Sequence, residues 1–196
     1  MDTKSYNRNL QHPKDRTITR VRISPKLREK AIARARLQSE KENSGLGDEA
    51  DLKGCLGEVV TEYWMDNNNI SYTEKLHSRE YDYVLNNSGC TVDVKTKDRN
   101  FKPQRGYDCT VPFYNHRYQK PDFFLFVSLL TFDNSNDLRG LEKFEFAFIV
   151  GSATYGDLEK VGIAYLRDEQ DWSNGTVMWT SALNILMYQL ISVTDT

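Results

Sequence analysis

The sequence predicts an α/β (α+β) fold in which a central mixed β-sheet is flanked by helices. Two observations predict it. Helical patterns near the N-terminal end give way to β-like stretches. Residues 122–132 are almost continuously apolar, as is typical of a central strand covered on both faces. A chain of 196 residues is long enough to bury a core of its own without disulfides or a structural metal.

Residues 1–47 are expected to form a basic N-terminal arm and a helix. Residues 1–23 are polar and show no periodicity until a short extended end. Ser24 and Pro25 are typical of a helix start, with serine as the N-cap and proline at the first helical position. The sequence therefore predicts a helix over 25–42, with a narrow apolar stripe and a largely basic remainder.

Residues 48–196 are expected to form the main domain, with a core at 48–131 and a C-terminal elaboration at 132–196. A second helix is predicted from about 48 to 66, because apolar residues recur along one helical face. The residues of that face are Leu52, Leu56, Val59 and Tyr63.

The middle of the chain is typical of β-structure. Residues 79–85 and 90–97 are predicted to be two strands that flank the turn sequence 86–89. A short strand is expected at 108–111, and a short helix at 113–119.

The C-terminal part combines all three kinds of pattern. Residues 143–150 alternate charged and aromatic residues at their start, which predicts a strand paired with 122–132. A helix is expected around 153–160, and residues 182–191 are amphipathic.

Charge is distributed unevenly along the chain. The formal net charge is −2, but residues 1–42 carry 12 Lys/Arg against 5 Asp/Glu, so the remainder is strongly acidic. A second basic stretch, 95–120, holds 7 basic and 2 acidic residues. Such asymmetry is typical of a polyanion-binding face on an acidic body, and a solvated surface is the alternative.

The sequence is not typical of a membrane protein or of a secreted protein. No apolar run approaches a transmembrane helix, and the first residues lack the apolar segment of a secretory signal. The three cysteines, Cys55, Cys90 and Cys109, are expected to be reduced thiols. We therefore expect a cytoplasmic protein that has no membrane partner.

Two predicted strands carry carboxylates among apolar residues. Side chains alternate along a strand, so Asp93 and Lys95 share one face of strand 90–97. Asp82 lies on the preceding strand, and a hairpin would bring it near Asp93. Two carboxylates in a poorly solvated place repel each other unless a cation neutralises them, and Mg²⁺ prefers such ligands.

The second predicted helix adds Glu58, which follows the run Gly54 to Gly57. Glu58 lies away from the apolar stripe, and its neighbours on the same face, Gly54 and Thr61, are small. A strand or a ligand therefore has room beside the carboxylate. Burying a glutamate is costly unless it has a partner, although a solvated helix glutamate is the plain alternative.

With these residues in order, the chain resembles the PD-(D/E)xK nuclease superfamily, which includes restriction endonucleases and Holliday-junction resolvases. The resemblance covers residues 48–131 and implies a restriction-endonuclease-like core, a Mg²⁺-dependent phosphodiester hydrolase and a DNA substrate. It departs from the family pattern because Tyr81 replaces the proline before Asp82, and because Asp93 stands where glutamate is common.

The resemblance also implies a role for each residue of the set. Asp82 and Asp93, with the carbonyl of Val94, would bind Mg²⁺ (Mn²⁺ as the usual substitute), and Glu58 would join directly or through water. Lys95 would orient the attacking water or stabilise charge at phosphorus. Gln104 or Gln119 would assist.

Basic residues beside this set suggest how DNA would be held. The basic residues that follow strand 90–97 could contact the DNA backbone. The helix 25–42 could be a second DNA-contacting element or a dimerisation helix. The candidates are Lys97, Arg99, Lys102, Arg105, Arg28, Arg34 and Arg36. Interleaved aromatics such as Tyr107 and Tyr114 could stack on bases, with core packing as the alternative. His116 is expected to be structural.

Three functions remain as alternatives to a DNA nuclease. The first is a non-catalytic nucleic-acid-binding or interaction protein on a degenerate nuclease fold. For Asp93 and Lys95 themselves, the plain alternative is an exposed ion pair on the sheet surface. The second is a ribonuclease. The third is a subunit of a larger nuclease assembly.

Overall fold

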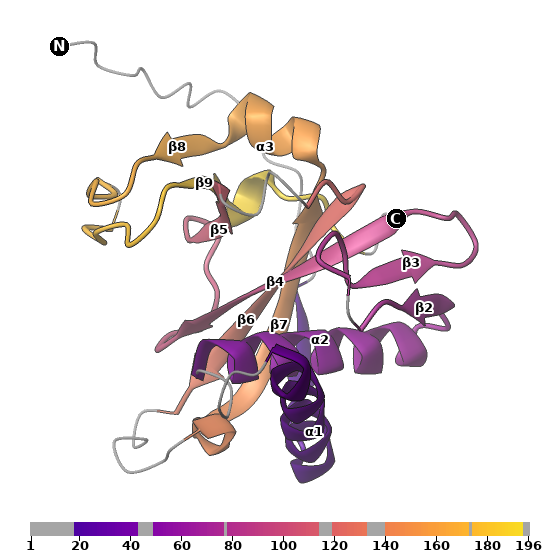
Figure 1. Ribbon diagram of the computed structural model, residues 1–196. Helices are drawn as coiled ribbons and strands as arrows, with labels where there is room; N and C mark the ends of the chain where they lie inside the picture. The colour runs from indigo at the N-terminus through magenta and orange to yellow at the C-terminus, as the bar shows by residue number, and fades with distance from the viewer. Residues whose placement is uncertain are drawn as a thin grey trace, which may run out of the picture.

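The computed structural model describes residues 18–42, 49–76, 78–113, 119–132, 140–172 and 174–193 (Figure 1). Among the regular elements, a short strand comes first, followed by two helices, a run of strands, a short helix and two last strands. They are β1 (Thr19–Arg22), α1 (Pro25–Glu42), α2 (Glu49–Asn67), β2 (Tyr72–Glu74), β3 (Tyr83–Leu85), β4 (Thr91–Arg99), β5 (Asp108–Pro112), β6 (Phe123–Thr131), β7 (Phe144–Ala153), α3 (Tyr155–Val161), β8 (Ile163–Tyr165) and β9 (Ala182–Leu186).

The predicted α+β class is confirmed. A 6-stranded sheet has the order β1-β7-β6-β4-β3-β2, with β4 and β6 parallel and the other neighbouring strands antiparallel. The apolar strand β6 lies at its centre, between β4 and β7, and is covered on both faces, as its composition predicts. The predicted pairing of β7 with β6 is also confirmed.

The helices α1 and α2 cover one face of the large sheet (Figure 1). The predicted start of α1 is confirmed: Pro25 is its first residue, and the Ser24 hydroxyl accepts a hydrogen bond from Leu27 N–H at 3.4 Å. Its stripe, which includes Ala31, packs in the same core as α2 and the sheet. The segment expected to form a separate arm and helix therefore shares the core of the main domain.

The other face of the large sheet carries a second, smaller layer. A 3-stranded sheet, β5-β9-β8, and the helix α3 pack there around a second apolar cluster (Figure 1). This layer was not predicted, although α3 lies where a helix was expected. The amphipathic segment 182–191 supplies β9 and a short 3-10 helix, Met187–Gln189.

The predicted hairpin forms, but its first strand is shorter than expected. β3 begins at Tyr83 because residues 78–82 form a bend, in which the Ser78 hydroxyl accepts hydrogen bonds from the backbone of Glu80 and Tyr81. The turn before β4 ends at Gly89, whose φ of 72° favours glycine.

Two further expectations concern the whole chain. Among the described residues, no helix is long and apolar enough to cross a membrane. The three cysteines are free, and burial raises the pKa of Cys55 and Cys109 to about 12, so those two thiols stay protonated at neutral pH. Most of the helix predicted at 113–119, including Tyr114 and His116, lies outside the described residues.

Candidate active site

Asp82 lies at the point where β3 leaves β4. The last register pair of the two strands is Tyr83 with Val92, and the Asp82 backbone N–H still donates to the Val92 carbonyl at 2.9 Å. Past this point the Asp82 carboxylate accepts a hydrogen bond from the Val94 N–H at 2.7 Å. The N–H and C=O of one strand residue point to the same edge, so the Val94 carbonyl also points toward Asp82.

Asp93 and Lys95 lie side by side on one face of β4, as the alternation predicts. The Lys95 ammonium is 2.7 Å from Asp93 Oδ2 and donates to Gln119 Oε1 at 2.7 Å. Asp93 is only 2 % exposed, and its Oδ2 accepts no hydrogen bond beyond the ion pair. The intervening residue Val94 packs toward α2, so Asp93 and Lys95 occupy the face opposite the helices.

Glu58 approaches from the helix side, and a glycine makes that approach possible. A Cβ on Gly57 would stand 1.9 Å from the Thr96 hydroxyl of β4, so α2 and β4 are in direct contact here. Gly54 has nothing within 4 Å of such a Cβ and serves no comparable purpose. The Glu58 side chain is 19 % exposed and forms an ion pair with Arg34 at 3.1 Å.

The three carboxylates interact electrostatically near the point where β3 leaves β4. Burial raises the pKa of Asp82 well above its usual value, and the charges of Asp93 and Glu58 raise it further. Burial, with Glu62 and Asp93 adding to it, raises the pKa of Glu58 to about 7, against the pull of Arg34. Burial also raises the pKa of Asp93, opposed by Lys95. A cation placed here would relieve this repulsion.

The donor set fits a hard divalent ion held by few protein ligands. Among the residues that the structure describes, no group of three His, Cys, Asp or Glu side chains is arranged to hold a metal ion. Mg²⁺ needs fewer, since proteins usually bind it through one or two carboxylates and leave several waters in place. Asp82, Asp93 and the Val94 carbonyl offer oxygens of this kind, and Asp93 Oδ2 already lies 2.7 Å from the Lys95 ammonium.

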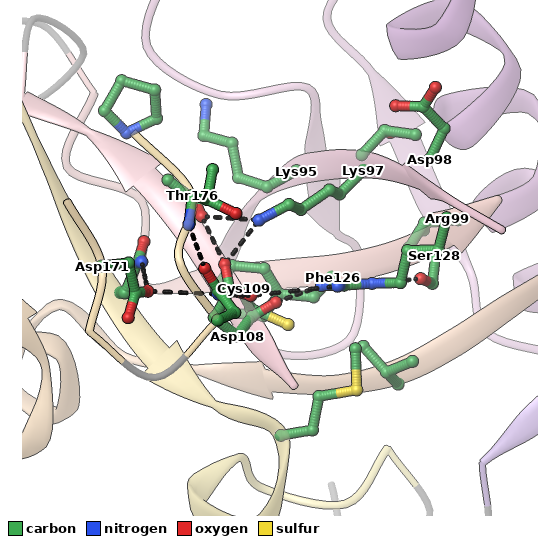
Figure 2. Close-up of a pocket in the computed structure, with 18 of the residues that line it drawn as sticks. Lys95, Lys97, Asp98, Arg99, Asp108, Cys109, Phe126, Ser128, Asp171 and Thr176 are labelled. Atoms are coloured by element: carbon green, nitrogen blue, oxygen red, sulfur yellow. Dashed lines mark hydrogen bonds and ion pairs between the residues drawn. The ribbon is translucent and has the colours of Figure 1, made fainter. Parts of the chain in front are cut away.

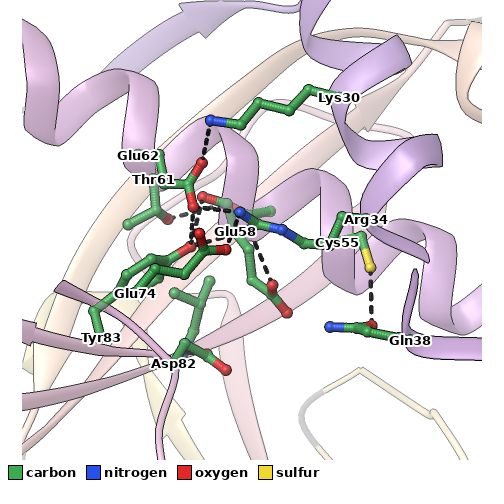
Figure 3. A network of polar contacts seen from close by, with 12 residues as sticks. Lys30, Arg34, Gln38, Cys55, Glu58, Thr61, Glu62, Glu74, Asp82 and Tyr83 are labelled. Carbon is green, nitrogen blue, oxygen red and sulfur yellow. Dashed lines mark hydrogen bonds and ion pairs between the residues drawn. The ribbon is translucent and has the colours of Figure 1, made fainter. Parts of the chain in front are cut away.

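A buried arginine that the sequence analysis placed on a DNA-binding surface completes the site. Arg34 of α1 is 5 % exposed, and its guanidinium contacts the carboxylates of Glu58, Glu62 and Glu74 (Figure 3). It also donates to the Tyr83 hydroxyl at 3.2 Å. The expected phosphate contact is therefore wrong for Arg34, because burial among carboxylates outweighs the basic character of α1.

A second cation and a tyrosine close this network. Lys30 of α1 lies 2.6 Å from Glu62, and burial of Glu62 is outweighed by Lys30 and Arg34, which hold its pKa below the usual value. The Tyr83 hydroxyl donates to the Glu58 carbonyl at 3.2 Å. A signal for this network was present in the sequence: Glu58 and Glu62 are four residues apart on one helical face, opposite the basic helix.

The other basic candidates occupy three different settings. Arg28 donates to the backbone carbonyls of Leu141 and Phe144 at 3.2 and 2.7 Å, which joins α1 to the start of β7. Arg36 is exposed on α1, and Lys102 and Arg105 are exposed on the segment after β4.

Lys97 and Arg99 turn inward from β4 toward Asp108 (Figure 2). Burial alone would raise the pKa of Asp108, but these two cations outweigh it and hold the pKa below its usual value. Arg99 also donates to the Ser128 hydroxyl at 3.0 Å, and its guanidinium lies 5.2 Å from the Tyr107 ring centre.

These cations line a pocket between the two sheets, next to the carboxylate cluster. Its volume is about 410 Å³, and Lys95 lines the pocket beside Asp93.

The chain matches no protein-family model, no curated protein and no solved structure. The geometry of the described residues is therefore the basis on which a function is inferred.

Proposed function

We propose that the protein is a Mg²⁺-dependent deoxyribonuclease of the PD-(D/E)xK type, which hydrolyses phosphodiester bonds in DNA. The observation that carries the proposal is the clustering of Asp82, Asp93 and Lys95 where β3 leaves β4, with Glu58 in the same electrostatic environment. A buried cluster of acids with one ammonium group at its rim suits phosphoryl chemistry better than it suits stability.

In this proposal Asp82 and Asp93, with the Val94 carbonyl, hold the ion, and Glu58 joins through water. Bound Mg²⁺ supplies a Lewis acid for the phosphate and lowers the pKa of a coordinated water. Glu58 belongs to α2, whereas Asp82 and Asp93 belong to the strand pair, and its carboxylate is restrained by Arg34, so it suits an outer position.

Lys95 is held in place by Asp93 and Gln119, both at 2.7 Å. A positioned ammonium beside the scissile phosphate stabilises the charge that develops in the transition state. Gln119, which the sequence analysis offered as an assisting residue, would act by orienting Lys95.

Cleavage of plasmid and linear DNA with Mg²⁺ or Mn²⁺ is the direct test. We expect cleavage that EDTA abolishes, and we expect Asp93→Asn and Lys95→Ala to lose it while remaining folded, with a native circular dichroism spectrum and cooperative unfolding, although loss of this buried ion pair lowers their unfolding midpoints. Asp98→Asn, on the same strand but the opposite face, and Lys160→Gln, on the exposed end of α3, are the matched controls and should stay active. Failure to cut duplex, single-stranded and branched DNA would contradict the proposal.

One observation favours a second candidate, a nucleic-acid-binding protein without catalysis. The ammonium of Lys95 already neutralises Asp93, which lowers the demand for a metal at that carboxylate. The DNA affinity of such a protein would fall as the salt concentration rises and would not require divalent ions. A titration of DNA binding and thermal stability with Mg²⁺ separates the two candidates.

A further inference from the structure

The pocket between the two sheets has features that cleavage at a backbone phosphate does not use. One wall is formed by β4 and β6 of the large sheet, and the other by the small sheet and the segment that leads into β9 (Figure 2). At about 410 Å³ it matches the size of small-molecule sites, roughly 300–1,000 Å³. A DNA duplex is too wide to enter this pocket, because the major groove is only one part of the duplex and is already about 12 Å wide.

Cations line the wall that continues into the candidate active site. Lys95, Lys97 and Arg99 extend from β4, and Lys53 reaches in from α2, where it lies 3.1 Å from Asp98. Lys95 belongs to both places, so a strand whose phosphate lies at Asp93 would have its next nucleotide at this pocket. Phosphate oxygens bind such cations, and here a phosphate would share Lys97 with Asp108 and Lys53 with Asp98.

The opposite wall presents large apolar side chains to solvent. Val177 and Trp179 line the pocket, are exposed, and precede β9. Trp179 is 71 % exposed, which is unusual for the largest apolar side chain. An aromatic face beside a cationic wall is the arrangement on which unpaired bases stack.

The floor of the pocket holds an acceptor that lacks a hydrogen bond. Asn184 of β9 is 5 % exposed and lines the pocket, and its Nδ2 donates to Asp171 Oδ2 at 3.1 Å. That contact sets the orientation of the amide, and the remaining Oδ1 is buried without a hydrogen-bond partner. A buried acceptor without a partner is costly, and the amino group of a base would satisfy it.

We propose that this pocket binds one unpaired nucleotide of a DNA strand, with its phosphate against Lys97 and Lys53 and its base between Trp179 and Asn184. The inference rests on the proposed function for the identity of the strand. It adds a substrate class, namely DNA that carries a single-stranded end, flap or gap beside the cleaved bond. Fully paired duplex offers no nucleotide to this pocket.

The test compares binding of fluorescent single-stranded, overhang-bearing and blunt duplex DNA by anisotropy, in EDTA so that no strand is cut. Wild-type protein should bind the unpaired forms about tenfold more tightly than blunt duplex, and Trp179→Ala and Val177→Glu should remove that preference. Trp172→Ala and Leu166→Glu are matched controls, since both residues are exposed and neither lines the pocket. They should retain the preference.

Equal binding of all three DNA forms by the wild type, or a preference that survives Trp179→Ala and Val177→Glu, overturns the inference. Competition by a free mononucleotide as effective as a single strand would also overturn it, because the pocket would then serve a separate ligand. Binding is measured without divalent ions, so the two proposals can fail separately. If the preference depends on the pocket but no DNA is cleaved in Mg²⁺, only the nuclease proposal is contradicted. If DNA is cleaved at the same rate with and without unpaired ends, only the proposal for the pocket is contradicted.

Discussion

The guanidinium of Arg34, carried by α1, lies 3.1 Å from the carboxylate of Glu58 on α2. The same guanidinium contacts Glu62 and Glu74, so one side chain ties α1, α2 and β2 together beside the candidate active site (Figure 3). The helix α1 therefore restrains the Glu58 carboxylate through this ion pair.

Arg34→Met should be strongly destabilising. It leaves Glu58 and the almost fully buried Glu62 without their shared cation, and loss of one partner of a buried ion pair costs about 3–5 kcal/mol. Urea unfolding measures the loss. Lys26→Met, on the exposed side of α1, should change the free energy of unfolding by about 0.5 kcal/mol or less. Similar losses in both variants would mean that Arg34 is not the hub of the network.

Gly57→Ala should disturb the contact between α2 and β4. Its new Cβ would meet the Thr96 hydroxyl, and overpacking of this kind costs about 1–3 kcal/mol. Gly54→Ala is the matched control one turn earlier; it meets nothing, and alanine's higher helix propensity should stabilise α2 by up to about 1 kcal/mol. Chemical denaturation of both variants, with cleavage rates alongside, measures the two effects. Stabilisation by Gly57→Ala would refute the close approach.

Local patterns predict the strand and helix residues of the site well. The alternation along β4 puts Asp93 beside Lys95, and the hairpin puts Asp82 near them. The helix period is a weaker guide, because Leu56 and Val59 are buried as expected but Tyr63, expected on the same face, is 47 % exposed. These are short-range consequences of backbone geometry, so a sequence is enough to derive them.

The partners of the basic residues cannot be derived that way. Arg34 meets carboxylates 24, 28 and 40 residues away, and its own helix shows only a run of surface-like cations. The pocket depends on the pairing of β5 with β9, which joins Asp108 to Leu186. Such distant pairings follow from the packing of whole layers, and no local pattern near Lys97 or Arg99 indicates that these side chains turn inward.

The raised pKa of Glu58 predicts a pH dependence of stability in the metal-free protein. Its folded pKa of about 7 exceeds the unfolded value near 4.5, so the native state binds more protons between these pH values. Stability is therefore lost as pH rises through this range, by up to about 3 kcal/mol.

Glu58→Gln isolates this effect, because glutamine keeps the shape of the side chain and cannot ionise. In EDTA, the wild type should lose stability relative to Glu58→Gln as pH rises from 4.5 to 7, with no further divergence above. Urea unfolding across this pH range gives the difference. Parallel curves would mean that Glu58 titrates as an ordinary surface carboxylate.

Added Mg²⁺ should reverse this loss, because a cation at the site neutralises the repelling carboxylates in the folded state alone. At a concentration about 100 times the dissociation constant, binding stabilises the folded protein by about 2.7 kcal/mol. The increase should be larger at neutral than at acidic pH, since the ligands must be deprotonated to bind. Asp93→Asn should abolish the increase in Tm, whereas Asp98→Asn, whose side chain is on the opposite face of β4, should retain it. Thermal unfolding with and without Mg²⁺ makes the comparison, and equal increases in both variants would indicate a general salt effect in place of a bound ion.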